Sequence, residues 1–247
     1  MASTTAIIVI VLVLIISVLI FYVFNSKKSL SNTVGATTMQ TIPATSLATN
    51  NNPVNFAYSI WFFVNDWQYN YGSNKIIFGR MSSSLSSETN LELSDFQNNS
   101  PCPVVLLGDY PNDLLILLDQ TPSTGSGSTL PDPVVVTNVP LQKWVHLVIS
   151  VYGKTMDTYI DGKLVRTTVM AGTANVDNTE SVYITPCGGF NGWTSNLQYF
   201  ATPLNPQQVW SMYQQGYSGS WMSTLSNTFN LTVTVNNNGV PTKTFTL

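Results

Sequence analysis

The only histidine of the chain, His146, lies in a stretch that also contains Asp157 and Asp161. A histidine held by a carboxylate can act as a general base. The same residues also fit a β-hairpin, because Asp161-Gly162 suits a two-residue type I′ turn. His146 occupies one position of an alternating strand, and no second histidine exists to share a metal or a proton. The pattern therefore favours a structural role, and it predicts no catalytic residue.

An acidic turn is a second place where chemistry could occur. Asp109, Asn112 and Asp113 could supply oxygen ligands to Ca²⁺, which needs several of them to converge. A turn between two strands calls for the same residue types. We therefore expect a turn without a metal or other cofactor, and Ca²⁺ is the alternative.

Aromatic residues form a third group. Trp67, Tyr69 and Tyr71 alternate in an Asn- and Gly-containing loop, and Trp193 follows Gly192. Such side chains can stack on a sugar ring, contact a partner protein, or pack within a sheet. Strand packing is the first expectation for these residues, and contact with a glycan or a protein is the alternative at all four positions.

Cys102 and Cys187 are far apart in the sequence, and no further cysteine or nearby histidine completes a tetrahedral zinc site. Zinc binding is therefore excluded. A disulfide between the two cysteines is possible in an oxidising compartment if the fold brings them together.

The elements that must position these residues are strands. From Asn55 onward the chain consists of short apolar runs, rich in aromatic and β-branched residues, which end in turn residues. In the run that contains His146, Val145 and Leu147 fall on one face, and Trp144 and His146 fall on the other. Many such runs with almost no helical period predict an all-β sandwich of two sheets.

Charged residues make up only 9% of the chain, against roughly 25% in an ordinary soluble domain. Nine lysines and arginines oppose twelve acidic residues, and no basic run exists that could neutralise a phosphate backbone. Nucleic acid is therefore not an expected partner.

The first apolar segment, residues 6–24, is long enough to cross the roughly 30 Å hydrocarbon core of a bilayer. A cleaved signal peptide is the competing interpretation. No Lys or Arg precedes the run, however, and no small-residue cleavage site closes it. We predict one transmembrane anchor over residues 1–25. Lys27 and Lys28 follow it directly, so the positive-inside rule predicts that the large C-terminal part faces the cytosol.

Two segments flank the predicted sandwich, which we place at residues 54–217. Residues 26–53 are rich in Ser, Thr and Asn without a period, which predicts a flexible tether, and a segment draped over the domain is the alternative. Residues 218–247 contain two alternating runs around Asn-Asn-Asn-Gly, which predict a β-hairpin extension.

Three motifs occur in order that resemble laminin-G-like, concanavalin A-like domains: "AYSIWFFVN", "WVHLVISVYGKTMDTYIDGKLV" and "GGFNGWTSNLQYFATPLNPQQVWSMYQQG". The resemblance covers about residues 55–216 and implies a two-sheet jelly roll, which in some relatives has a sugar or Ca²⁺ site. Glycoside hydrolases of this fold carry Glu-x-Asp-x-x-Glu. Here Glu88 and Glu92 are four residues apart with no acid at position 90, so hydrolysis is not expected.

These features predict a non-enzymatic, membrane-anchored structural or interaction protein. The layout of an anchor followed by a laminin-G-like domain resembles membrane-associated virion proteins of large DNA viruses. It implies a minor capsid or inner-membrane protein that links a lipid membrane to a protein shell, with capsid or membrane proteins as partners. A membrane-tethered lectin is the alternative, and a glycoside hydrolase is the third.

Overall fold

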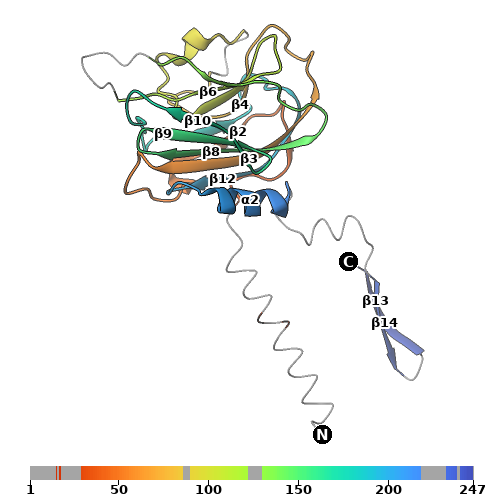
Figure 1. Ribbon diagram of the computed structural model, residues 1–247. Coiled ribbons are helices and arrows are strands. Elements are labelled where there is room, and N and C mark those ends of the chain that lie inside the picture. Colours follow the sequence, from red (N-terminus) through yellow and green to blue (C-terminus); the bar gives the residue numbers. More distant parts are fainter. Residues whose placement is uncertain are drawn as a thin grey trace.

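The computed structural model describes residues 29–85, 90–121, 130–217, 232–237 and 240–246, together with Ile15 and Ser17. Two antiparallel sheets face each other and form a sandwich (Figure 1). This architecture confirms the predicted all-β fold and fits the jelly roll that the sequence motifs imply.

Each sheet of the sandwich has six strands. Sheet A contains, in spatial order, β1 (Val34–Gly35), β12 (Asn191–Phe200), β3 (Phe56–Asp66), β8 (Trp144–Tyr152), β9 (Thr155–Ile160) and β10 (Lys163–Val169). Sheet B contains β2 (Gln40–Ile42), β11 (Val182–Ile184), β4 (Lys75–Arg80), β5 (Val104–Leu107), β6 (Leu114–Leu117) and β7 (Val134–Val136).

The core between the sheets follows the two-residue period of the strands. In β8, Val145, Leu147, Ile149 and Val151 point inward and are fully buried, as their alternation predicts. The inward side chains of β3, which begin with Phe56 and Tyr58, pack against them. Long central strands that pair along most of their length therefore fix the register of sheet A.

Both outer faces of the sandwich are covered as well. The 3₁₀ helix η2 (Leu93–Phe96) places Phe96 against the outer side of sheet B, where Val104 and Leu106 of β5 also lie. The helix α2 (Pro206–Gln215) covers part of the outer side of sheet A (Figure 1). Its Val209 and Met212 contact aliphatic and aromatic side chains of that sheet.

The limits of α2 follow from its sequence. Asn205 caps the first turn by accepting a hydrogen bond from the backbone N–H of Gln208, and the Gln208 side chain accepts one from the Asn205 backbone N–H. Pro206 stands at the first helical position, which needs no backbone donor. The helix ends at Gln215 and is followed by Gly216, whose φ of 76° lies in a region that glycine adopts without a steric penalty.

The prediction of a flexible tether is wrong for residues 29–53. Leu30 is bonded to β12 through its backbone, β1 extends sheet A, and β2 extends sheet B. The 3₁₀ helix η1 (Ala44–Ser46) follows β2. The chain therefore joins the sandwich at about residue 29 and contributes an edge strand to each sheet.

The predicted anchor, residues 6–24, and the flanking Lys27 and Lys28 lie outside the described residues, apart from Ile15 and Ser17, which are helical. Within the described part of the chain, no helix is both long and apolar enough to span a bilayer. In the C-terminal segment, β13 (Thr232–Asn237) and β14 (Val240–Thr246) pair with each other as a separate antiparallel hairpin.

Candidate functional site

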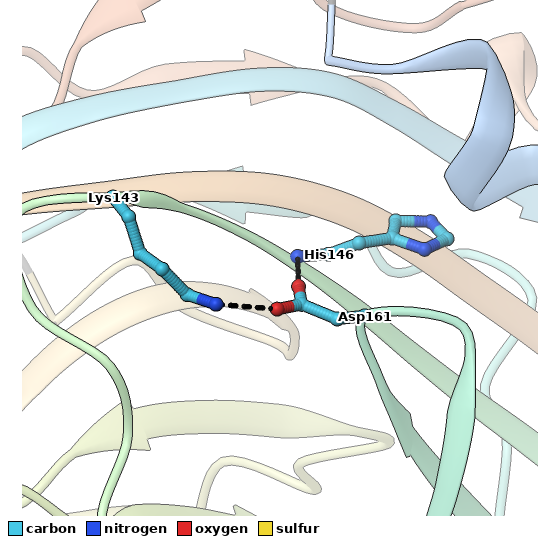
Figure 2. Close-up of polar contacts among 3 residues, drawn as sticks. All are labelled: Lys143, His146 and Asp161. Carbon is cyan, nitrogen blue, oxygen red and sulfur yellow. Dashed lines mark hydrogen bonds and ion pairs between the residues drawn. The ribbon is translucent and has the colours of Figure 1, made fainter.

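Asp161 does not form a catalytic dyad with His146. Its carboxylate accepts one hydrogen bond from the backbone N–H of His146, at 2.9 Å, and one from Nζ of Lys143, at 2.8 Å. Figure 2 shows that the imidazole ring points away from this carboxylate. Asp161 has φ of 50° in the β9–β10 turn, so it is a turn residue that also fixes the start of β8.

The His146 ring is buried on the outer side of sheet A. Its Nε2 is hydrogen-bonded to Oγ of Ser59 at 2.9 Å, and the ring stacks on Trp61 with centroids 4.7 Å apart. Burial lowers the pKa of His146 to about 4, although the charge of Asp161 acts in the opposite direction. The imidazole is therefore neutral at pH 7 and belongs to the packing between the sheet and the helix.

This packing is one part of an aromatic cluster that crosses the outer side of sheet A. Trp61 stacks on Tyr213 of α2, and Trp144 stacks on Tyr217 with ring planes only 6° apart and centroids 4.3 Å apart. Phe63 joins the cluster edge-on, between Trp144 and Trp193. We call this set the aromatic face; its members are Trp61, Phe63, Trp144, His146, Trp193, Trp210, Tyr213 and Tyr217.

The aromatic face is only partly covered. Trp193 is 43% exposed, Trp210 is 42% exposed and Tyr217 is 38% exposed, whereas His146 is completely buried. Large side chains whose only role is to pack a helix against a sheet would be buried along their whole length. The exposed rings therefore offer an apolar surface edged with indole and phenol polar groups, which suits a contact that is partly dry and partly wet.

The beginning and the end of the segment 29–217 both contact β12, which carries Trp193 of this face. Leu30 donates a backbone hydrogen bond to the Leu197 carbonyl at 2.8 Å. The hydroxyl of Ser195 donates to the Tyr217 carbonyl at 2.9 Å, and it lies 2.7 Å from the hydroxyl of Thr33. The segment that follows residue 28 and the segment that ends at residue 217 thus converge on one part of β12.

The structure divides the four predicted aromatic contacts between two environments. Trp67 packs against the core and donates from Nε1 to the Tyr110 carbonyl at 3.2 Å, while Nζ of Lys75 lies 4.7 Å from its ring centroid. Tyr69 is half-buried, and Tyr71 is exposed beside Tyr110, with their ring centroids 5.4 Å apart. Trp193 instead contacts Phe63 on the aromatic face.

The side chains of the turn at residues 109–113, where Ca²⁺ is the alternative prediction, bond to backbone groups of the turn and of residues 138 and 139. Asp109 accepts from the backbone N–H of Tyr110, and Asp113 accepts from that of Asn138. The amide of Asn112 donates to the Val139 carbonyl. Among the residues that the structure describes, no three acidic, histidine or cysteine side chains gather as metal ligands would.

Cys102 and Cys187 do not form a disulfide in the structure. Cys102 is fully buried in the core between the sheets, where burial raises the pKa of its thiol. Cys187 packs on the outer side of sheet B, with Sγ 2.8 Å from the Leu85 carbonyl.

Glu88 and Glu92 are the two acidic residues that were compared with the glycoside hydrolase motif. Glu92 donates its backbone N–H to the Asp95 carboxylate, and Glu88 lies outside the described residues.

Of the aromatic face, the sequence analysis identifies only Trp193 as a candidate contact residue. Two signals were available. The outward residues of β3 and β8 include Trp61, Phe63 and Trp144, so these strands carry aromatic side chains on their outer faces as well. Trp210 and Tyr213 are three residues apart, which places them on one face of a helix. Together they indicate a helix that lies across an aromatic sheet surface.

Comparison with protein families matches residues 34–210 to the concanavalin A-like lectin/glucanases superfamily. The chain belongs to this family. The match starts at β1, ahead of the sequence-based boundary at residue 54, and extends into α2. No curated protein sequence matches the chain.

Solved structures share the fold at low sequence identity. The receptor binding domain of botulinum neurotoxin C/D mosaic serotype is 12% identical, with a TM-score of 0.54 over 79% of this chain and 47% of that one. The serotype D ligand binding domain in complex with N-acetylneuraminic acid is also 12% identical, with a TM-score of 0.52 over 78% of this chain and 46% of that one. The chain spans about half the length of these structures, which show its fold alone.

Proposed function

We propose that the protein is a non-catalytic, membrane-anchored binding protein whose aromatic face lies against the lipid bilayer. The apolar segment 6–24 would be the anchor, and the sandwich would be the part that binds other proteins. A domain on a long tether could turn any face toward the membrane. In this proposal the sandwich instead has one fixed face toward the lipid and one fixed face away from it.

The observation that carries this proposal is the position of Leu30. Five residues separate it from Phe24, the last residue of the apolar segment. Even a fully extended chain of this length spans only about 20 Å. Since Leu30 is hydrogen-bonded to β12, which also carries Trp193 of the aromatic face, an anchor in the bilayer would hold Leu30 within about 20 Å of the lipid surface and this strand close to it.

The chemistry of the face supports the same orientation. Trp and Tyr are enriched where membrane proteins cross the membrane–water interface, because their rings are apolar and their N–H and O–H groups remain hydrated. Trp193, Trp210 and Tyr217 are the exposed members of the face. A protein whose anchor emerges beside them gains membrane contact without a conformational change.

The finer assignment, a virion component between an inner membrane and a protein shell, extends the proposal. The low share of charged residues supports it, since a surface covered by neighbouring proteins needs few charges for solubility. Lys27 and Lys28 support a cytosol-facing sandwich. Protease treatment of intact particles, followed by identification of proteins cross-linked to the sandwich, tests this assignment, and full digestion in intact particles would contradict it.

Two measurements on the full chain in phosphatidylcholine vesicles test the membrane contact. Resistance to alkaline extraction tests the anchor. Quenching of tryptophan emission by lipids brominated near the headgroup tests the face, and we expect Trp193→Phe combined with Trp210→Phe to remove about half of the quenching. Trp67→Phe, at a half-buried ring in the β3–β4 loop, is the matched control and should leave the quenching unchanged. An extraction-resistant chain with equal quenching in all variants would retain the anchor and refute the membrane-facing surface.

A membrane-tethered lectin is the second candidate. Tyr71 and Tyr110 favour it, because they are exposed by 53% and 59% and form an edge-to-face pair at a loop tip. A solved structure of the same fold is a complex with N-acetylneuraminic acid. Glycan-array binding by the full chain in detergent, lost on Tyr71→Ala and kept on Trp193→Phe, would establish this function. An array without a signal would reject it.

A further inference from the structure

A pocket of about 240 Å³ lies beneath the segment that follows β2. One wall is formed by residues 44–50, which include η1. Arg80 of sheet B and Tyr199 of sheet A line it from the sandwich, and Asn178 lines it from the loop before β11. Its size fits a small molecule of a few non-hydrogen atoms up to a single sugar ring rather than a polymer.

Arg80 is the unusual residue of this pocket. Its side chain is only 3% exposed, and its Nε is buried without a hydrogen-bond partner. The one ion pair that the described residues form joins Lys143 to Asp161, so no carboxylate among them lies within 4.0 Å of the Arg80 guanidinium. A guanidinium stays charged in proteins, so it cannot reduce the cost of burial by losing its proton. A buried cation of this kind calls for an anionic partner.

The acidic side chains around Arg80 are committed to other groups. Asp119 accepts from the Gln120 backbone and from the Asn175 amide. Asp177 accepts from the backbone and the hydroxyl of Thr179.

Glu180 balances the positive charge of Arg80 only in part. Burial, and then the neighbouring Asp177, raises the pKa of Glu180 to about 7, and its Oε2 is buried without a hydrogen-bond partner. Asp119, Asp177 and Glu180 therefore act on Arg80 at longer range, and among the described residues none of them forms a direct ion pair with its guanidinium.

The other groups of the pocket are neutral and can donate hydrogen bonds. Asn50 donates from Nδ2 to Tyr199 Oη at 3.1 Å, which leaves the phenol hydrogen available as a donor. Thr45, Thr49 and Asn178, which carry two hydroxyls and an amide, line the same space. Arg80 is the only charged residue of the pocket lining, and a planar guanidinium pairs with a carboxylate through two parallel hydrogen bonds.

We infer that this pocket binds a small organic carboxylate, a simple acid or an acidic monosaccharide, whose two oxygens pair with Arg80. The inference does not depend on membrane attachment, because every residue involved belongs to the sandwich. It also assigns a role to residues 44–50, which close the site from outside.

Thermal unfolding of the full chain in detergent tests the inference, with sodium acetate and sodium glucuronate as probes and sodium chloride keeping the ionic strength constant. A ligand that binds only the folded state raises the melting temperature, and we expect a rise of about 2–4 °C at a saturating concentration. A shift with both probes indicates a general carboxylate site, and a shift with glucuronate alone indicates an acidic sugar. The absence of a shift with both probes would overturn the inference.

Arg80→Met is the decisive variant. If Arg80 lacks a partner in the fold, the variant melts at the same or a higher temperature than the wild type without a probe, and it loses the carboxylate shift. A variant that melts lower, fails to fold or keeps the shift would overturn the inference, since Arg80 would then be paired within the fold or irrelevant to binding.

Two further variants make the result specific. Arg166→Met removes an exposed arginine on β10 and should keep the full shift. Tyr199→Phe removes one pocket hydroxyl and should reduce the shift by about half. Equal loss of the shift in Arg166→Met and Arg80→Met would contradict a specific site.

Discussion

The outer sides of the two sheets are covered in different ways. On sheet B, η2 and its neighbours seal an aliphatic surface, and Phe96, Val104 and Leu106 are fully buried there. On sheet A, α2 covers only part of an aromatic surface, and Trp193 and Trp210 remain about 40% exposed. The outer side of sheet B thus forms a fully buried hydrophobic cluster. The outer side of sheet A has partly exposed aromatic rings that a binding partner could cover. We therefore expect the interaction surface on sheet A.

The largest expected effect lies on the closed side. Phe96→Ala should lower the free energy of unfolding by about 3–5 kcal/mol, because it leaves a cavity where the whole ring is buried. Chemical denaturation of the full chain in detergent measures this loss. A change below about 1 kcal/mol would show that sheet B is as open as sheet A.

The buried part of the aromatic face should respond to pH. The pKa of His146 is about 4 in the fold and near 6.5 when unfolded, so the unfolded state binds more protons between these values. Stability should therefore fall by about 2–3 kcal/mol as the pH drops from 6.5 to 4.

The measurement for this pH effect is the difference between the wild type and His146→Gln across that range. The difference is needed because Glu180, with a pKa raised to about 7, acts in the opposite direction. Parallel stability curves for the two proteins would contradict the burial of a neutral imidazole.

The fit of α2 can be tested at Gly162. This residue has φ of 77°, and a β-carbon placed there would lie 2.8 Å from the Trp210 ring. Gly162→Ala should cost about 1–2 kcal/mol through backbone strain and displacement of the helix. Denaturation measures the cost, and Gly153→Ala, where φ is 57° but no atom lies within 4 Å of the added carbon, separates strain from contact.

The smallest effect on stability is expected at the open edge of the face. Trp193→Ala should change the free energy of unfolding by only about 0.5–1 kcal/mol, since the ring is half exposed and contacts mainly Phe63. Denaturation in detergent measures this value beside that of Phe96→Ala. Equal losses for the two variants would remove the distinction between the two sides.

The sequence was sufficient for the fold wherever strands are long. β3 and β8 display their period over 11 and 9 residues, and the Asp161-Gly162 turn has a local signature. β1 and β2 contain 2 and 3 residues, so they have no period and exist only because β12 and β11 offer edges to them. The tether prediction failed for this reason.

The site was harder to predict than the fold. Trp193 and the Trp67 loop stand out as single aromatic residues, but the aromatic face depends on α2 returning to β3 and β8, which is a long-range contact. The pocket at Arg80 is also invisible in the sequence, because residues 44–50 have no pattern that would place them over β4. Arginine at the end of an apolar strand normally reaches solvent, and here the returning chain covers it.

The early strands β1 and β2 also determine how the protein can be shortened. A truncation that begins at residue 54 would delete them and leave β12 and β11 as two bare edges on the same side of the sandwich. Bare edges recruit strands from other molecules, so such a fragment would polymerise. A version that starts at residue 29 keeps both edges capped and should remain monomeric.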